Sequence, residues 1–189
     1  MKIEIDPQDN CHDTLKTAFR NLIKSNLISQ QLWASDFREA RKYVNDLSYA
    51  KEIATIKIAS SRRSGHSTII LDMINEFYNI ALILTHNIHQ RDFYMERIRY
   101  ETLKPNSNFL GGQSIERTPQ LFRTSSTTIY LGTINSLDSL RGLPQIEAAF
   151  IDCASFLSNK KKDQVYDVLL PYMHFPKNPP STFQYIFVQ

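Results

Sequence analysis

The stretch from Ile56 to Leu71 constrains the fold of this chain more than any other part of the sequence. It begins with the pattern of a short apolar strand, continues as a tight loop of small and basic residues, and then shows the apolar spacing of a helix. A strand, such a loop and a helix N-terminus together form a layout in which backbone N–H groups surround a phosphate anion. The same pattern also fits an ordinary turn between a strand and a helix.

The loop matches part of the phosphate-loop consensus G-x-x-x-x-G-K-[S/T] over the positions from Ser60 to Ser67. Gly65 occupies the second glycine position, and Ser67 stands where the hydroxyl contacts Mg²⁺. Ser60 replaces the first glycine and His66 replaces the lysine. The loop therefore keeps the glycine next to the helix and the hydroxyl, but not the fixed ammonium group.

A second segment, residues 148–151, is an apolar run that ends at Asp152. In phosphate-loop enzymes a carboxylate at the end of such a strand holds Mg²⁺, often through water, opposite the loop hydroxyl. Taken alone, an aspartate after an apolar strand is commonly a turn or helix-cap residue. Together with the loop upstream, Asp152 and Ser67 predict a site for Mg-ATP.

Alternating apolar patterns predict helices and strands along the whole chain. The sequence favours an α/β domain with a mainly parallel sheet flanked by helices, of the phosphate-loop NTPase class, with N-terminal helices. We expect residues 1–50 to form a helical segment packed on the core, and residues 51–189 to form the nucleotide-binding type of domain. The expected helices are 13–27, 30–47, 67–77, 89–103 and 164–170, and the expected strands are 55–59, 80–84, 128–132, 148–151 and 183–188.

Composition excludes several classes of protein. A chain of 189 residues with 42% hydrophobic content can bury a sizeable core. The N-terminus lacks the apolar segment of a signal peptide, no run reaches membrane-spanning length, and two cysteines form no disulfide framework. We therefore expect a soluble intracellular protein without a membrane partner. The net charge of +3 is compatible with nucleic-acid binding.

Other catalytic chemistries find little support in the sequence. His86, His89 and Cys153 are not spaced as zinc ligands, and no C-x-x-C pair exists. The chain also lacks the G-x-S-x-G turn of a serine hydrolase. We expect neither a zinc site nor a serine nucleophile.

Several segments together resemble the ATPase domain of the viral large terminase subunit, the DNA-packaging ATPase of tailed phages and herpesviruses. Residues 61–68, SRRSGHST, resemble the family's loop S-R-Q-x-G-K-T-T. Residues 133–142, TINSLDSLRG, resemble the segment with an Arg-Gly pair before the second strand motif. Residues 150–157, FIDCASFL, resemble the family's motif of two apolar residues followed by D-E-x-x-F-[I/L]. Residues 185–188 fall where the family has its coupling-motif strand.

The resemblance covers roughly residues 50–189 and implies a viral protein of DNA packaging or DNA handling, in the host cytoplasm or nucleus. It implies that Ser67 and Asp152 hold the metal of Mg-ATP. No carboxylate-rich nuclease segment follows in this sequence, so we do not expect the DNA-cutting activity of a large terminase. The resemblance also implies that the nucleotide contacts Ser61, Arg62, Arg63, Ser64, Gly65, His66, Ser67 and Thr68.

Two departures from the family pattern affect the expected chemistry. His66 replaces the lysine that grips the β- and γ-phosphates, and a mostly neutral imidazole is a poor substitute. Cys153 replaces the glutamate that orients the attacking water. Because losing one positioned group at such a site costs on the order of 10²–10³ in rate, we expect little or no ATP hydrolysis. We assign no catalytic residue beyond phosphate contacts by Arg62 and Arg63.

Basic residues outside the loop predict contacts with DNA. Lys160, Lys161 and Lys162 follow the Asp152 strand in an expected exposed loop, and Arg97 and Arg99 lie on the expected helix 89–103. A charge run is commonly just a solvated surface, and contact with a phosphate backbone is the functional hypothesis. Besides DNA, the expected partners are a viral packaging protein, another protein, or a second copy of this chain.

Two other functions remain open. In the first, the chain is a working motor ATPase in which Arg63 replaces the lysine and a carboxylate replaces the glutamate, from Asp138, Glu147 or a neighbouring subunit. Turnover that is lost in Asp152→Ala would favour this function. In the second, the chain is a structural or inhibitory interaction protein without a nucleotide site, which predicts full function after Ser67→Ala.

Overall fold

The computed structural model describes residues 11–35, 44–59, 65–102, 120–123, 127–140, 143, 146–152, 154–172 and 183–189. The expected nucleotide contacts Ser61, Arg62, Arg63 and Ser64 lie outside the described residues, as does Cys153. For these positions the assignments stay predictions from the sequence.

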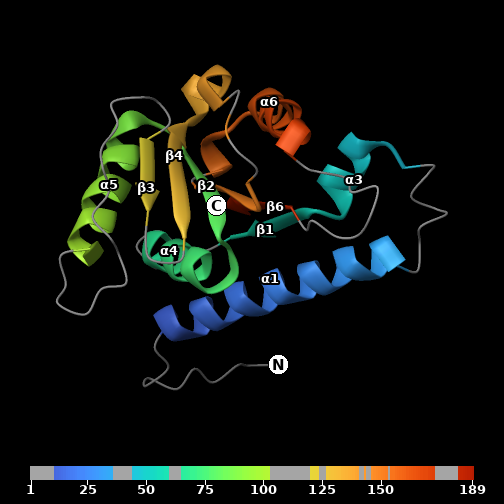
Figure 1. Cartoon of the computed structure of the whole chain (residues 1–189), viewed down its shortest axis with the longest axis horizontal. Coiled ribbons are helices and arrows are strands. Elements are labelled where there is room, and N and C mark those ends of the chain that lie inside the picture. The colour runs from blue at the N-terminus through green and yellow to red at the C-terminus, as the bar shows by residue number, and fades with distance from the viewer. Residues whose placement is uncertain are drawn as a thin grey trace, which may run out of the picture.

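A six-stranded sheet forms the centre of the molecule, with strands in the order β1-β6-β5-β2-β4-β3 (Figure 1). Every neighbouring pair is parallel except β3 and β4. The predicted mainly parallel sheet is confirmed. The strands are β1 Thr55–Ile58, β2 Ile80–Thr85, β3 Gln120–Arg123, β4 Thr128–Thr133, β5 Ala148–Ile151 and β6 Gln184–Val188.

Helices cover both faces of this sheet (Figure 1). Helices α1, α4 and α5 pack on one face, and α3, α6 and the 3₁₀ helix η1 pack on the other. This arrangement is consistent with an α/β phosphate-loop NTPase fold. The helices are α1 Cys11–Ser35, α3 Asp46–Glu52, α4 His66–Phe77, α5 Ile88–Thr102 and α6 Asn159–Leu169, and the 3₁₀ helices are η1 Ile134–Leu140, η2 Ala154–Phe156 and η3 Leu170–Tyr172.

The central strands are apolar along their length because both of their faces are buried. Ile83 and Phe150 point into the core under α1, α4 and α5. Leu82 and Ala149, their neighbours in sequence, point into the core under α3 and α6. A strand that is buried on both faces loses the alternation of apolar and polar residues, which is why short apolar runs located these strands correctly.

The structure corrects three expectations about the elements. The helix α1 runs without a break through residues 28–30, where we expected one helix to end and another to begin, because no glycine or proline interrupts it there. Strand β3 was not expected at all. Helix α6 begins at Asn159, so Lys160, Lys161 and Lys162 lie in its first turn rather than in a loop.

The early start of α6 has a local cause. The side chain of Ser158 caps the helix by accepting a hydrogen bond from the Lys161 N–H at 3.3 Å. Serine is among the preferred residues at this position, since its oxygen satisfies one of the unpaired N–H groups of the first turn. The cap stabilises a helical conformation for a lysine run that, from its charge alone, suggested a loop.

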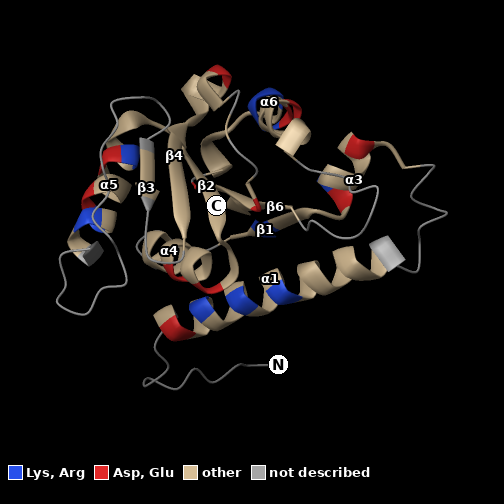
Figure 2. Cartoon of the chain, in the orientation of Figure 1, with Lys and Arg blue, Asp and Glu red and all other residues tan. Residues whose placement is uncertain are grey.

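Two ion pairs join α1 to α4. Lys16 Nζ lies 2.6 Å from Asp72 Oδ2, and the Arg20 guanidinium donates to both Glu76 oxygens at 2.8–3.0 Å. The partners advance by four residues on both helices, so α1 and α4 run in the same direction. Figure 2 shows the basic side of α1 facing acidic residues of α4.

The Arg20–Glu76 pair predicts an acid-dependent contribution to stability. The hydrogen bonds from Arg20 lower the pKa of Glu76 below its ordinary value of 4.5. A carboxylate with a lowered folded-state pKa stabilises the fold above its unfolded-state pKa, and this contribution disappears as the pH falls through the folded-state pKa. We expect Glu76→Gln to have a lower Tm than the parent at pH 7, by circular dichroism, and the same Tm in acid. A difference of equal size at both pH values would contradict this interpretation.

A buried polar network ties α1 to the sheet. Gln184 of β6 is fully buried, accepts a hydrogen bond from the Tyr78 hydroxyl, and donates to Asn26 Oδ1 at 2.7 Å. Asn26 in turn donates to the carbonyl oxygen of Ile53 at 2.7 Å, just before β1. Burial, followed by the nearby Glu147 carboxylate, raises the pKa of Tyr78, so its hydroxyl keeps its proton. The network therefore connects four segments that are distant in sequence.

Among the helices in the described part of the chain, none is both long enough and apolar enough to cross a bilayer.

Candidate nucleotide site

The carboxyl ends of the parallel strands bring the two predicted halves of the site to one edge of the sheet. Ile58 pairs with Val188, and Ile151 pairs with Phe187. Asp152 therefore stands level with the end of β1, with β6 between them. The separation is two strand spacings, roughly 10 Å.

Gly65 begins helix α4 in a conformation that favours glycine. Its φ is +79°, in the left-handed region, which side chains with a Cβ adopt at a cost of roughly 1–2 kcal/mol. A Cβ at this position would also lie 2.8 Å from His12 Cδ2, because the first turn of α1 covers the residue. The backbone conformation favours glycine here, and the His12 side chain would have to turn away from any larger residue.

The first turn of α4 carries the Ser67 hydroxyl group and a backbone N–H group outside the helical hydrogen bonds. The Gly65 carbonyl accepts hydrogen bonds from the N–H groups of Thr68 and Ile69 at 3.0 and 3.1 Å, so the helix's own bonding starts with these residues. The N–H of Ser67 precedes that ladder and points toward the N-terminal end, as in any helix. The Ser67 side chain is half-buried and has no hydrogen bond to the described residues.

Arg97 brings a positive charge to the same turn from the neighbouring helix α5. Its Nη2 donates to Thr68 Oγ1 at 3.0 Å, and its Nε is buried without a partner among the described residues. The sequence suggested Arg97 as a DNA contact, whereas its half-buried guanidinium faces α4. It lies next to the helix start at which His66 replaces the lysine of the consensus.

Asp152 is held in a fixed orientation by two donors on α5. The residue is 2% exposed, and its Oδ2 accepts hydrogen bonds from Gln90 Nε2 and the Tyr94 hydroxyl, both at 2.8 Å. Its N–H donates to the Leu84 carbonyl at 2.9 Å. The other carboxylate oxygen, Oδ1, has no hydrogen bond to any described residue, which leaves it for a cation or a water molecule.

Gln90 and Tyr94 were not recognised in the sequence as site residues. They lie four positions apart on one helix and therefore point to the same side. That spacing was readable in the expected helix 89–103. Nothing local indicated that this side would meet Asp152, since the contact joins residues about 60 positions apart.

The donor set fits a magnesium ion rather than a metal enclosed by protein ligands. Within the described ranges no group of three or more histidine, cysteine, aspartate and glutamate residues gathers around one point. Mg²⁺ in nucleotide sites is commonly bound through one or two protein oxygens, with phosphates and water as the other ligands. Ser67 and the free oxygen of Asp152 match this requirement.

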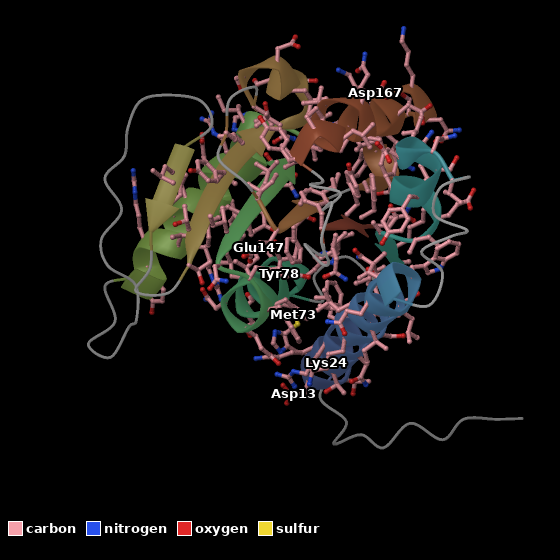
Figure 3. All side chains as sticks on the ribbon, turned by 45° about the vertical axis from the view of Figure 1, so that its right-hand side comes forward. Asp13, Lys24, Met73, Tyr78, Glu147 and Asp167 are labelled. Carbon is pink, nitrogen blue, oxygen red and sulfur yellow. The ribbon has the colours of Figure 1, made fainter. Side chains whose placement is uncertain are left out.

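Glu147 lies at the amino end of β5, opposite the end that carries Asp152, so it cannot replace the missing glutamate within this chain. It precedes β5, and its carboxylate accepts hydrogen bonds from the backbone N–H and the side chain of Asn79 at 2.6 and 3.2 Å. Figure 3 shows it beside Tyr78. Five strand positions, roughly 17 Å, separate it from Asp152. Asp138, the other candidate, is exposed on η1 after the carboxyl end of β4.

The basic residues expected to contact DNA lie on two different helices. Lys160, Lys161 and Lys162 belong to α6, whereas Arg97 and Arg99 belong to α5. These helices cover opposite faces of the sheet and are well separated in Figure 2. The two groups therefore do not form one continuous surface.

No protein-family model matches the sequence, and no curated protein matches it. Among solved structures, the chain is similar to a mutant of the large terminase ATPase domain of Thermus phage P74-26. The TM-score is 0.47 and the sequence identity is 14%, over 82% of this chain and 68% of that chain.

Proposed function

We propose that this chain is a terminase-ATPase-like domain that binds Mg-nucleotide and hydrolyses it slowly or not at all. In this proposal it serves viral DNA packaging or DNA handling by binding DNA or a protein partner. The observation that supports the nucleotide site is the environment of Asp152. A buried carboxylate with one oxygen fixed by two donors and the other unbonded to the described residues lies at the same sheet edge as Gly65 and the start of α4.

Each residue has a distinct task in this proposal. Gly65 lets the backbone approach the phosphates, and the Ser67 N–H and hydroxyl face them. Gln90 and Tyr94 keep Asp152 oriented toward the metal position. The bound Mg²⁺ would neutralise phosphate charge, and Arg97 would add a cation beside the first turn of α4.

Slow hydrolysis follows from what the site lacks. The lysine position holds His66, and the glutamate position holds Cys153. Arg97 can replace part of the missing charge, but it does not replace a base that orients water. Glu147 lies at the opposite end of the strands, and Asp138 is exposed on η1 beyond β4, so binding without efficient turnover is the behaviour that these residues support.

Calorimetric titration with Mg-ATP tests the proposal. We expect saturable binding to the parent protein and at least tenfold weaker binding to Asp152→Asn, since the variant loses a charge-assisted contact. Asparagine is preferable to alanine because its carbonyl can still accept a hydrogen bond from Tyr94. Asp167→Asn, at an exposed position of α6 (Figure 3), is the matched control and should bind like the parent.

Three outcomes would contradict parts of this proposal. No heat and no thermal stabilisation at millimolar Mg-ATP would show that the chain has no nucleotide site. Equal binding by the parent and Asp152→Asn would remove Asp152 from the site. Rapid phosphate release by the parent that Asp152→Asn abolishes would replace the proposal of slow hydrolysis with a working motor.

A further inference from the structure

A cavity of about 250 Å³ lies on the other side of the sheet, between α3, the edge strand β1 and the first turn of α6. Each of these three elements contributes one lysine: Lys51 from α3, Lys57 from β1 and Lys162 from α6. In Figure 2, α3 lies at the right, with α6 above and β1 below it toward the middle of the view. The sequence suggested Lys162 as a DNA contact but gave no reason to group it with Lys51 or Lys57.

The cavity carries an excess of positive charge. Among the described residues one carboxylate lines it, from Asp163, and this carboxylate pairs with Lys51 Nζ at 2.6 Å. Lys57 and Lys162 have no carboxylate partner among the described residues. Like charges collected around one cavity repel each other, so the arrangement favours an anion between them. The side-chain amides of Asn159 and Gln189 add hydrogen-bond donors to the same lining.

The other wall of the cavity is aromatic and tightly fixed. The Tyr166 hydroxyl lies 2.9 Å from Thr55 Oγ1, and its ring lies 5.5 Å from the ring of Phe187. Lys51 Nζ stands 5.5 Å from the centre of the Tyr166 ring. Burial raises the pKa of Tyr166, so the phenol adds no negative charge at neutral pH. The cavity therefore places ammonium groups around a rigid aromatic base, in which Tyr166 and Phe187 are themselves nearly buried.

We infer that this cavity binds a phosphate group carried on a sugar, either in the backbone of a nucleic-acid strand or in a free nucleotide. The lysines suit the phosphate, and the side-chain amides of Asn159 and Gln189 suit the hydroxyl groups of the sugar. The volume is just below the roughly 300–1,000 Å³ of pockets for drug-sized ligands, which suits one nucleotide unit. Lys160 and Lys161, on the same turn of α6, continue the positive charge outside the cavity.

The nucleic-acid form of this inference rests on the DNA-handling part of the proposed function, and it names the site through which DNA is held. The described lining of the cavity differs from that of the Mg-nucleotide site, because it includes neither Asp152 nor Gly65. All binding measurements for it are therefore made with EDTA and without Mg²⁺.

Fluorescence anisotropy with a labelled single-stranded oligonucleotide of about 20 nucleotides tests the inference. Unlabelled duplex and adenosine monophosphate serve as competitors. We expect Lys57→Gln/Lys162→Gln to bind the strand at least tenfold more weakly than the parent, since hydrogen bonds to charged groups are lost. Lys160→Gln/Lys161→Gln removes the same charge from the same surface outside the cavity, and should lose much less.

The outcomes separate the sources of the phosphate. If oligonucleotide binding is weakened only in Lys57→Gln/Lys162→Gln, the ligand is a nucleic acid. If adenosine monophosphate binding, measured by calorimetry, is weakened only in that variant, the ligand is a free nucleotide. Equal losses in both double variants would show general attraction by charge and overturn the inference. Absence of all binding by the parent would also overturn it, while Mg-ATP binding would still decide the proposed nucleotide site.

Folding of the variants does not obscure the result. Lys57 and Lys162 make no ion pair with the described residues, so their replacement should leave the Tm unchanged or slightly higher. If the double variant nevertheless unfolds, the single variant Lys57→Gln, on the exposed edge strand, gives the same comparison against Lys160→Gln.

Discussion

Replacing Gln184 by leucine is expected to lower the free energy of unfolding by about 3 kcal/mol, through the lost hydrogen bonds and the buried groups left without partners. For a chain of this size that corresponds to a Tm lower by roughly 6–12 °C. The side chain is fully buried in β6 and joins Tyr78 to Asn26. Leucine has a similar volume, so the effect reports on hydrogen bonding more than on packing.

A double variant separates the two contributions. Tyr78→Phe removes the hydroxyl that Gln184→Leu leaves without an acceptor. We expect the double variant Tyr78→Phe/Gln184→Leu to be clearly more stable than the sum of the single effects predicts, because removing both partners avoids a buried unsatisfied group. The measurement is urea unfolding of all four proteins. Additive effects would show that the two side chains do not depend on each other.

Gly65→Val is expected to destabilise the fold by about 2–4 kcal/mol, from the cost of a β-branched residue at positive φ and from overpacking. It should also weaken Mg-ATP binding, because valine disfavours the left-handed backbone conformation with which Gly65 begins α4. The Cβ would lie 2.8 Å from His12 Cδ2 of α1, so the His12 side chain would have to turn away from a residue larger than glycine.

The two causes can be distinguished in a second set of variants. Asparagine tolerates the left-handed region better than other residues with a Cβ. If the contact with His12 dominates, Gly65→Asn should be much less destabilising in a His12→Ala background than in the parent. If both backgrounds show the same loss of stability in urea unfolding, the backbone conformation alone requires glycine.

Sequence patterns located the parallel strands well because their apolar runs are determined by burial on both faces. The run at 80–84 and the run at 148–151 ended close to the observed β2 and β5. The short strand β3 pairs antiparallel at the sheet edge, where burial imposes a weaker pattern. The predicted start of helix α6, residue 164, lies five residues after the observed start at Asn159, because the lysine-rich first turn has no apolar residue to mark it.

The site could be predicted only as far as local motifs reach. Gly65 and Asp152 follow apolar strands and were therefore recognisable as positions on one sheet edge. Gln90 and Tyr94 bind Asp152 from a different helix, and no short pattern encodes such a contact. The same limit applies to the cavity lined by Lys51, Lys57 and Lys162, which come together only in the folded chain.

The position of β6 sets an order for the assembly of the nucleotide site. Within the described residues β1 has one sheet partner, and that partner is β6. Thr55 of β1 can therefore join the sheet only after Tyr185 of β6 is present. During synthesis β1, which precedes the loop, and β5, which precedes Asp152, have no strand between them until residues 184–188 have left the ribosome. Such distant pairing slows folding and leaves apolar strands open in the meantime. If the proposed function is correct, a nucleotide cannot assist the early stages of folding, and binding it requires a chain in which β6 has already joined β1 to β5.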